Sequence, residues 1–199
     1  MSDAGEIKAC YKTCLQNENI EFEEGQHTLE KILEADVVVK SPGIPDHIDL
    51  VNRVKEKGIE IISEIEFGFR HKGNAKIIAI TGSNGKTTTT SLAYDIMKRA
   101  GAKVALAGNI GTSFAEAVAV GGVDYYVLEI SSFQLDGTMH FRPDVAVLLN
   151  ITPDHLDRYD YKLENYAASK FKIMQNQGPA DTFIFFNDDE IITRLSLIH

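Results

Sequence analysis

The glycine-rich segment TGSNGKTT, residues 81–88, narrows the choice of fold for this 199-residue chain at once. It follows an apolar run, KIIAI at residues 76–80, whose β-branched residues are typical of a buried strand. It precedes residues 87–100, which read as a helix capped by Gly101. A glycine-rich turn between a strand and a helix is a setting in which backbone N–H groups cradle phosphates. The segment therefore predicts a phosphate-binding loop in an α/β fold.

The residues of this loop suit the phosphates of ATP together with Mg²⁺. Gly82 and Gly85 allow tight turns that bring N–H groups to the phosphates. Lys86 would reach the β- and γ-phosphates, and the Thr87 hydroxyl would coordinate Mg²⁺. The spacing G-x-x-G-K-T is shorter than that of the common phosphate-binding loop motif. The alternative is a chance Gly-Lys-Thr in a turn, which the flanking strand and helix disfavour. The expected nucleotide-binding residues are Gly82, Ser83, Asn84, Gly85, Lys86, Thr87 and Thr88.

Apolar strands alternate with helices along the chain, which indicates a parallel sheet covered on both faces. The expected strands are residues 37–39, 59–62, 76–80, 104–107, 125–130, 145–151 and 182–186. The expected helices are residues 49–57, 87–100, 114–120 and 163–177. We therefore expect an α/β fold, with a partial Rossmann-like N-terminal domain at residues 1–70 and a P-loop parallel-sheet central domain at residues 75–199. The polar residues 71–74 would separate the two domains.

Both ends of the chain read as incomplete. Residues 1–6 have no strand character, although a Rossmann-like domain opens with a strand and a Gly-rich turn. Residues 195–199 offer no closing element. We therefore expect the chain to be a fragment, with its central domain incomplete at the C-terminus.

Polar side chains follow several of the expected strands. Ser41, the loop at residues 81–87, Asn109, Glu129 and His155 each come at or just after a strand end. Ligands of open α/β sheets bind at the carboxyl ends of the strands, so these residues are expected to share one edge. Glu129 finishes an apolar strand and is a candidate Mg²⁺ ligand, because this ion prefers oxygen donors. The alternative for Glu129 is a helix N-cap or a solvent-facing acid.

His155 and Lys170 have both a functional and a structural interpretation. Thr152 could cap a helix with Pro153 at its first position, which would place His155 in the first turn. A single His is more often a structural hydrogen-bonding residue. Lys170 borders an apolar helix stripe, and composition alone describes it as a solvated lysine.

Composition excludes several classes of partner. The formal net charge of −9 argues against broad nucleic-acid binding, which needs basic surface. No apolar run reaches the roughly 20 residues of a membrane span, and residues 1–6 do not begin a secretory signal. We therefore expect a cytoplasmic protein with no membrane partner. Cys10 and Cys14 are expected to be ordinary reduced thiols.

Four further segments of the sequence are SPGIP at residues 41–45, ITGSNGKT at residues 80–87, GNIG at residues 108–111 and NITPDHLD at residues 150–157. Together they resemble the motifs of the Mur ligase family, which builds the peptide stem of peptidoglycan. A fifth segment, LEISSFQL at residues 128–135, is similar to the members of the family that add D-glutamate, and DHLDRY at residues 154–159 supports the same members. The resemblance covers residues 25–187.

The resemblance implies an ATP-dependent carboxylate–amine ligase whose small-molecule substrates are UDP-N-acetylmuramoyl-L-alanine and D-glutamate. ATP would phosphorylate the muramoyl carboxylate, and the amine of D-glutamate would displace phosphate from the resulting acyl phosphate. Lys86, His155 and Lys170 would be the catalytic residues.

The resemblance also assigns binding roles. Thr87 and Glu129 would hold one Mg²⁺ and His155 would help to hold a second, while Lys170 would react with CO₂ to give a carbamate that also binds metal. The residues matching positions that touch the muramoyl substrate are Ser41, Pro42, Gly43, Asn109, Ser131 and Gln134.

Two departures from the family pattern qualify this expectation. The family's first strand and Gly-rich turn, which grip the uridine diphosphate, have no expected counterpart before Gly25, and no C-terminal domain for D-glutamate follows His199. We therefore expect no ligase turnover from this chain alone, as tested by ADP release that depends on both substrates. The alternatives are a P-loop phosphotransferase or NTPase, a non-catalytic nucleotide-binding module, and another Mur-type or folate polyglutamylating ligase.

Overall fold

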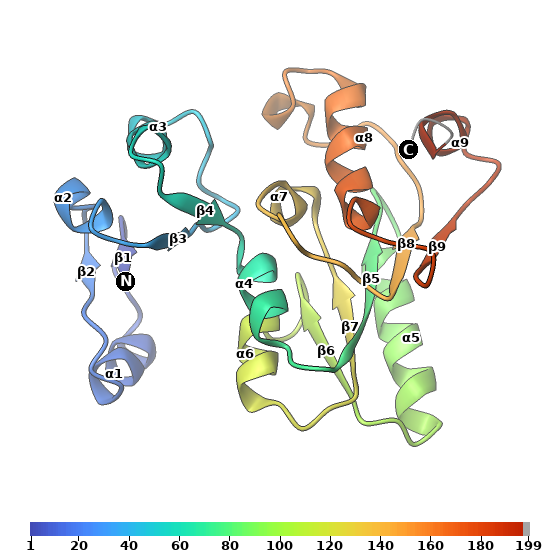
Figure 1. Ribbon diagram of the computed structural model, residues 1–199, viewed down its shortest axis with the longest axis horizontal. Helices are drawn as coiled ribbons and strands as arrows, with labels where there is room; N and C mark the ends of the chain where they lie inside the picture. The colour runs from blue at the N-terminus through green and yellow to red at the C-terminus, as the bar shows by residue number, and fades with distance from the viewer. Residues whose placement is uncertain (197–199) are drawn as a thin grey trace. The chain divides into compact units, whose positions relative to one another are not determined.

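The computed structural model describes residues 1–196, and the chain divides into two compact units. The first unit consists of residues 1–38 and 45–61, and the second of residues 39–44 and 62–199. Figure 1 shows the helices and strands of both units.

The first unit is a small α/β arrangement of short elements. Strand β1 pairs in parallel with β2, and β3 is the neighbour of β4 in a second two-stranded sheet. The elements are β1 (Ser2–Asp3), α1 (Ala9–Asn17), β2 (Glu23–Glu24), α2 (Leu29–Ile32), β3 (Val37–Val39), α3 (Asp49–Glu56) and β4 (Glu60–Ile62). The expectation that residues 1–6 lack strand character is wrong. Ser2 and Asp3 form β1 because their register partners, Glu23 and Glu24, supply the pairing that local sequence does not reveal.

The second unit is built on a five-stranded parallel sheet in the order β6-β7-β5-β8-β9 (Figure 1). Apolar runs form these strands, and Ile77, Ala79, Val127 and Leu128 are fully buried in it. The strands are β5 (Lys76–Thr81), β6 (Val104–Gly108), β7 (Tyr125–Glu129), β8 (Val145–Leu148) and β9 (Thr182–Phe185). The α/β class and the parallel sheet expected from the sequence are confirmed.

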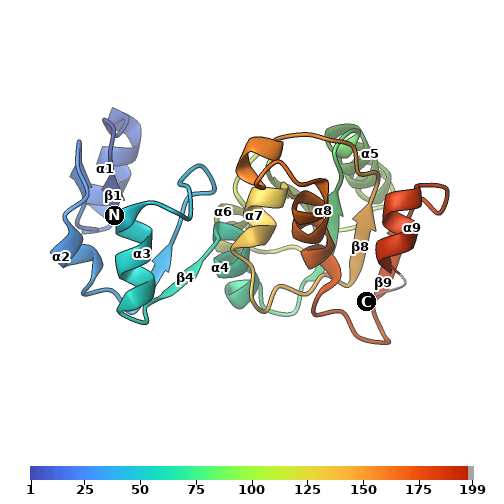
Figure 2. The same ribbon diagram turned by 90° about the horizontal axis from the view of Figure 1, so that it is seen from above.

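Helices cover both faces of this sheet. On one side, α4 packs on α6 and α7 around a core that includes Phe114, Leu135 and Phe141, while α5 packs on β5, β6 and β7 from the other side (Figure 2). The helices are α4 (Glu64–His71), α5 (Lys86–Arg99), α6 (Phe114–Val120), α7 (Ser132–Asp136), α8 (Leu163–Phe171) and α9 (Glu190–Ser196), with 3₁₀ turns η1 (Leu156–Arg158) and η2 (Lys172–Met174).

Most expected elements are present with shifted ends. Residues 114–120 form α6 as expected, whereas the expected helix at 163–177 is α8 followed by the tighter turn η2. The expected strand at 145–151 ends at Leu148, because the chain turns there to run beside the glycine-rich loop, where Ser83 N–H donates to Asn150 O. No closing element was expected at residues 195–199. Helix α9 occupies residues 190–196, and residues 197–199 lie outside the described residues.

The register of the sheet places the glycine-rich loop in the middle of one edge. Ile80, at the end of central β5, is paired with Glu129 of β7 and with Val147 of β8. Gly108 of β6 is paired with Glu129 in turn. The residues that follow β5, β6, β7 and β8 therefore emerge at the same edge, which is the ligand-binding edge of open α/β sheets.

Candidate nucleotide and substrate site

The glycine-rich loop turns sharply between β5 and α5. Gly85 adopts φ +81° at the N-cap of α5, a left-handed conformation that glycine adopts without strain. The N–H groups of the first turn of a helix have no partner within the helix, and the positive end of the helix dipole lies at the same terminus. The start of α5 is thus suited to bind phosphate oxygens.

A second segment braces the loop from the side. Ser83 N–H donates to Asn150 O over 3.0 Å, and Asn84 N–H donates to Asn150 Oδ1 over 2.9 Å. The Ser83 hydroxyl donates to Thr152 O over 2.9 Å and lies 3.1 Å from the Tyr166 hydroxyl. The loop is therefore held in shape by residues 150–152 and by helix α8.

Two lysine side chains converge on one carbonyl oxygen of the loop. Lys86 Nζ donates to Gly82 O over 2.9 Å and to Ser83 O over 3.0 Å. Lys170 Nζ donates to the same Gly82 O over 2.8 Å and lies 4.6 Å from the centre of the Tyr166 ring. Lys170 is only 1% exposed, so the interpretation of Lys170 as a solvated helix lysine is wrong.

Burial, followed by the positive charge of Lys86, lowers the pKa of Lys170 to about 7 from an ordinary value of 10.5. Desolvation disfavours the charged form of an amine, and a like charge nearby acts in the same direction. A substantial share of the Lys170 side chains is therefore neutral near pH 7, and a neutral amine is a nucleophile.

A carboxylate lies beside the start of α5. Glu129 is 2% exposed, and its Oε2 accepts from the Thr87 hydroxyl over 2.7 Å. Its Oε1 accepts from Asn109 Nδ2 over 2.8 Å, and Asn109 N–H donates to Glu129 O over 2.8 Å. The alternative of a solvent-facing acid is therefore wrong. The neighbouring oxygens of Thr87 and Glu129 suit Mg²⁺, which binds oxygen ligands together with phosphates.

Close backbone packing brings Asn109 to this carboxylate. Gly108 has φ +102°, and a Cβ atom at this position would lie 2.3 Å from Glu129 O. Only glycine fits where β6 passes so near the end of β7. This close approach explains why Asn109 reaches Glu129 with both its main chain and its side chain.

The backbone at His155 differs from the expected helix start. His155 has φ +50° and ψ 31°, a left-handed conformation that non-glycine residues rarely adopt, and the 3₁₀ turn η1 begins only after it. Thr152 is occupied with the loop, because its N–H donates to Ser83 Oγ and its Oγ1 accepts from Asn84 Nδ2. The expected helix with Thr152 as its N-cap is therefore wrong. The exposed His155 side chain lies 3.6 Å from an Asp154 carboxylate oxygen.

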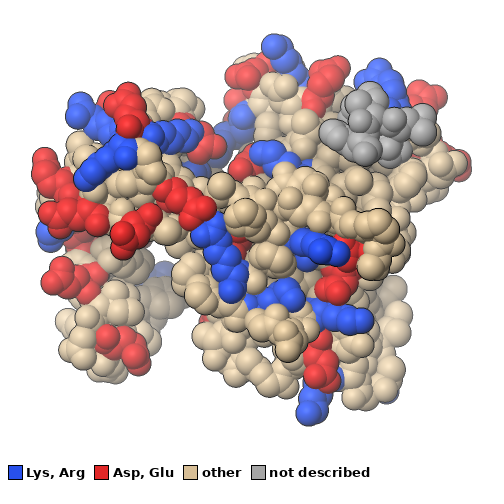
Figure 3. Space-filling model, in the orientation of Figure 1, with Lys and Arg blue, Asp and Glu red and all other residues tan. Residues whose placement is uncertain are grey.

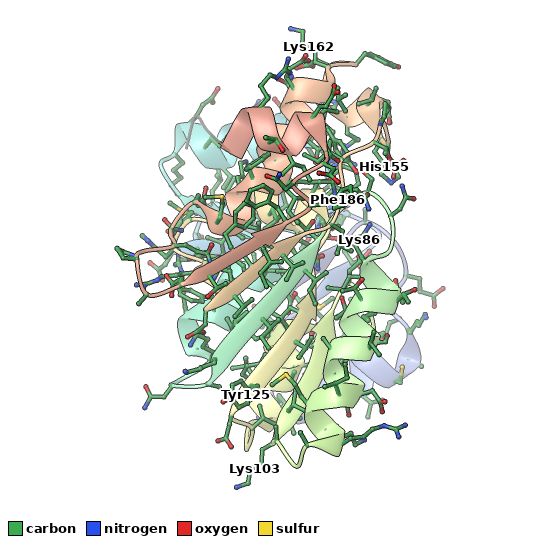
Figure 4. The ribbon with its side chains drawn as sticks, turned by 90° about the vertical axis from the view of Figure 1, so that its right-hand side faces the viewer. Lys86, Lys103, Tyr125, His155, Lys162 and Phe186 are labelled. Carbon is green, nitrogen blue, oxygen red and sulfur yellow. The ribbon has the colours of Figure 1, made fainter. Side chains whose placement is uncertain are left out.

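Lys86, Lys170, Asn109 and His155 line one pocket of about 300 Å³, whereas Thr87 and Glu129 do not line it. Lys86 and His155 lie toward the same end of the strands, while Lys103 and Tyr125 mark the opposite end (Figure 4). The pocket is lined by Pro42, Gly43, Lys86, Asn109, Ser131, Ser132, Phe133, Asp154, His155, Arg158, Tyr166 and Lys170.

Seven of the sixteen site residues expected from the sequence line this pocket, and the other nine do not. Pro42, Gly43, Asn109 and Ser131 share the pocket with the three expected catalytic residues, while Glu129 joins them through Thr87 and Asn109. Ser41, Asn84 and Thr88 are exposed to solvent and do not line the pocket. Gln134 forms a capping box at the start of α7, where its Oε1 accepts from Ser131 N–H and its own N–H donates to Ser131 Oγ.

Five lining residues had no individual expectation: Ser132, Phe133, Asp154, Arg158 and Tyr166. A signal for Tyr166 was available, because it precedes Lys170 by one helical turn and so shares its face of α8. Phe133 and Arg158 could not be found this way, because their proximity depends on the left-handed turn at His155. Among residues 1–196, no group of three or more His, Cys, Asp or Glu side chains is placed to hold a metal without other ligands.

Surface charge and hydropathy add two observations. Acidic and basic side chains are interspersed on the face shown in Figure 3, with acidic ones prominent over the first unit. In the described part of the chain, no helix combines the length and the apolar character that crossing a membrane requires.

The fold and this site define an α/β protein with a glycine-rich loop between a strand and a helix, and with a pocket at the same edge of its parallel sheet. A family model described as Mur ligase middle domain matches residues 80–198, and one described as MurD N-terminal domain matches residues 1–50. The chain belongs to the Mur ligase family. The second match also corrects the expectation that the resemblance begins at Gly25, because it extends to residue 1.

Curated relatives and solved structures agree with this membership. UDP-N-acetylmuramoylalanine–D-glutamate ligase from Bacteroides fragilis is 60% identical over 194 residues, which are 98% of this chain and 44% of the relative. The enzyme of the same name from Cytophaga hutchinsonii is 55% identical over 193 residues, 96% of this chain and 43% of the relative. The chain thus spans less than half the length of these relatives.

The fold likeness extends to more distant proteins. The crystal structure of UDP-N-acetylmuramate:L-alanyl-gamma-D-glutamyl-meso-diaminopimelate ligase from Neisseria meningitides matches with a TM-score of 0.67 at 18% identity, over 100% of this chain and 67% of that chain. UDP-N-acetylmuramate-alanine ligase MurC from Thermotoga maritima matches with a TM-score of 0.53 at 20% identity, over 97% of this chain and 44% of that chain. At these identities the likeness concerns the fold alone.

Proposed function

We propose that the chain is part of an ATP-dependent ligase that adds D-glutamate to UDP-N-acetylmuramoyl-L-alanine in peptidoglycan synthesis. The observation that carries the proposal is the convergence of Lys86 and Lys170 on Gly82 O, in a pocket that also holds His155 and Asn109. A plain phosphate-binding loop needs Lys86 and Thr87 but gives no role to a buried lysine from a distant helix. The high identity to ligases of this name supports the substrate assignment.

The proposed reaction makes a poor electrophile reactive. A carboxylate oxygen of the muramoyl substrate forms a bond to the γ-phosphorus of ATP as ADP departs. The amine of D-glutamate then bonds to the acyl carbon, and phosphate leaves. Bound Mg²⁺ would neutralise phosphate charge during these steps.

The residues of this chain have defined parts in that reaction. The N–H groups at the start of α5 and the Lys86 ammonium would bind and orient the phosphates, because they already converge on the loop. Thr87 and Glu129, whose oxygens lie 2.7 Å apart, would hold Mg²⁺, with His155 assisting at a second ion. Asn109, Ser131, Gln134 and the turn at residues 41–43 would contact the muramoyl substrate.

Lys170 is proposed to act as a carbamate. Its neutral Nζ would form a bond to the carbon of CO₂ and release a proton to solvent, which replaces a cation by an anionic oxygen ligand. The pKa of about 7 makes the neutral amine available under mild conditions. Incubation with ¹³C-bicarbonate should give a carbamate resonance in the wild-type chain and none in Lys170→Ala. In the longer ligase of which this chain is proposed to be a part, a short carboxylic acid should restore turnover to Lys170→Ala.

The remaining assignments follow from the same proposal. Residues 1–70 are proposed to bind the UDP part of the substrate and residues 75–199 to bind ATP. A cytoplasmic location fits an ATP-consuming reaction and the free thiols of Cys10 and Cys14. No nucleic-acid or membrane partner is proposed.

Calorimetric titration of the chain with UDP-N-acetylmuramoyl-L-alanine, with Mg²⁺ and a non-hydrolysable ATP analogue present, tests the proposal. The ligase assignment expects both ligands to bind together, with weaker binding of the muramoyl nucleotide that lacks L-alanine. A phosphotransferase or NTPase would bind the ATP analogue and give no heat with the muramoyl nucleotide, which would contradict the proposal.

A further inference from the structure

The turn at Ser41-Pro42-Gly43 belongs to the second unit, although the chain on either side of residues 39–44 belongs to the first. Within the turn, Ile44 N–H donates to Ser41 O over 3.0 Å, and Lys40 Nζ donates to Ile44 O over 2.7 Å. Pro42 and Gly43 line the pocket that Lys86 and Lys170 also line. The position of this turn therefore sets one wall of the pocket.

A side chain from a distant segment reaches the tip of the turn. Arg158 Nη2 donates to Pro42 O over 3.1 Å. Arg158 ends the 3₁₀ turn η1, which starts directly after the left-handed His155. The unusual backbone at His155 thus sets the direction in which the chain presents Arg158.

An aromatic ring supports the guanidinium. Arg158 Cζ lies 4.6 Å from the centre of the Phe133 ring. Phe133 is stacked on Tyr159, with ring centres 5.8 Å apart and planes 6° apart. Tyr159 is buried, and its hydroxyl donates to Asp136 Oδ2 over 2.9 Å. The Phe133 plane therefore rests on a fixed group, which limits where the exposed Arg158 side chain can go.

Arginine suits this place better than lysine does. A planar guanidinium stacks on an aromatic face and keeps its N–H donors in the same plane, whereas an ammonium is a compact and strongly hydrated charge. One donor bonds Pro42 O while the face of the group rests on Phe133. Both contacts fix the same side chain at the rim of the pocket.

We propose that Arg158 is a positioning residue that holds the Ser41-Pro42-Gly43 turn in its place on the pocket wall before the muramoyl substrate binds. Phe133 is the platform for the Arg158 side chain. The inference rests on the proposed function only for the identity of the ligand, because the contact between Arg158 and the turn is independent of it.

The test compares Arg158→Ala with Arg158→Lys, Phe133→Leu and the control Arg99→Ala in the full chain. Arg99 is an exposed arginine whose Nε bonds Asp95 over 2.7 Å, so its removal also deletes one surface contact. It is the last residue of α5, at the end of the helix opposite to Lys86. The first measurement is hydrogen exchange of the Ile44 amide, which bonds within the turn. The second is the affinity for UDP-N-acetylmuramoyl-L-alanine and, separately, for Mg²⁺ with ADP.

Arg158→Ala should speed exchange of the Ile44 amide about tenfold, as expected when one hydrogen bond to a charged group is lost. It should weaken binding of the muramoyl nucleotide about tenfold and leave ADP affinity within about twofold. Phe133→Leu should act in the same direction, and Arg158→Lys should recover part of both losses. Arg99→Ala should match the wild type.

Two outcomes would overturn the inference. One is Ile44 exchange in Arg158→Ala equal to that in Arg99→Ala. The other is equal weakening of muramoyl and ADP binding, which would mean a general loss of structure. If Arg158→Ala does not fold, Arg158→Lys and Phe133→Leu decide by the same exchange measurement. If the wild-type chain binds no muramoyl nucleotide, the proposed substrate is wrong, whereas the exchange measurement still tests the contact.

Discussion

Lys86 is the side chain on which nucleotide binding should depend most strongly. Its ammonium rests on Gly82 O and Ser83 O, at the mouth of the glycine-rich loop. Lys86→Ala should weaken binding of Mg²⁺ with ADP about 100-fold, because charge-assisted hydrogen bonds to phosphate contribute roughly 1.5–3 kcal/mol. Titration calorimetry measures the change. Lys98→Ala, at the far end of the same helix, is the control and should bind like the wild type; equal affinities for both variants would contradict the role of Lys86.

Lys170 should make stability depend on pH in a definite direction. Its pKa is about 7 in the folded chain against an ordinary value of 10.5, so between these values the unfolded chain binds more protons and stability rises with pH. Lys170→Met removes this dependence. In CO₂-free buffer, the stability of Lys170→Met relative to the wild type should therefore fall as pH rises from 7 toward 10.5. Urea unfolding at several pH values measures it, and a difference that does not vary with pH would refute the burial effect.

At the scale of the elements, the approach of β6 to β7 should not tolerate a side chain at Gly108. A Cβ atom there would lie 2.3 Å from Glu129 O, at φ +102°. Gly108→Ala should cost about 3 kcal/mol or more, because backbone strain and overpacking act together. Gly101→Ala is the matched control, since Gly101 has φ +83° and open space for a Cβ atom. It should cost only about 1–2 kcal/mol from the left-handed backbone. Similar losses of unfolding free energy for both variants would show that the close approach does not matter.

Helix α4 is tied to the segment after α7 by a buried carboxylate. Glu66 is fully buried, and its Oε2 accepts from the N–H groups of Met139, His140 and Phe141 over 2.9–3.0 Å. Its Oε1 accepts from Arg70 Nε over 3.0 Å. Glu66→Ala should cost about 3–5 kcal/mol in urea unfolding, because buried donors lose their partner. Glu116 on α6 is exposed, and Glu116→Ala should cost about 1 kcal/mol or less. A similarly small cost for Glu66→Ala would show that the hydrogen bonds of Glu66 do not stabilise the fold.

The elements show which parts of the fold could be predicted from the sequence. The strands of the second unit were predictable because each is a continuous apolar run, as in KIIAI before the loop. Strand β1 was not, since Ser2 and Asp3 gain strand structure only from pairing with Glu23 and Glu24. The left-handed turn at His155 was also missed, because Thr152 bonds the glycine-rich loop instead of capping a helix. Local propensity cannot report a partner that lies 69 residues away.

For the candidate site, the sequence indicated several of the residues that line the pocket, but not the contacts that these residues make. Lys86, Asn109 and His155 line one pocket, as their strand-end positions on a parallel sheet suggested. Ser131 and Lys170 line it too, but only the family resemblance assigned them to the site. The burial of Lys170 depends on α8 folding over the loop, which no local pattern encodes.

For the whole molecule, ligand binding should protect one unit selectively. Mg²⁺ with ADP at 100 times its dissociation constant should stabilise the folded state by about 2.7 kcal/mol. Slower hydrogen exchange is expected in the glycine-rich loop, in residues 149–152 and in α8, because hydrogen bonds link these segments. Exchange measured with and without ligand tests this, and protection confined to residues 1–38 would contradict it.

The most direct measurement is a crystal structure of the chain with Mg²⁺, a non-hydrolysable ATP analogue and UDP-N-acetylmuramoyl-L-alanine. The proposed arrangement predicts phosphate oxygens on the N–H groups of the loop and on Lys86. It predicts Mg²⁺ about 2.1 Å from oxygens of Thr87 and Glu129, and the substrate carboxylate in the pocket with Lys170. A nucleotide bound away from the loop, or a muramoyl group outside this pocket, would contradict the central claim.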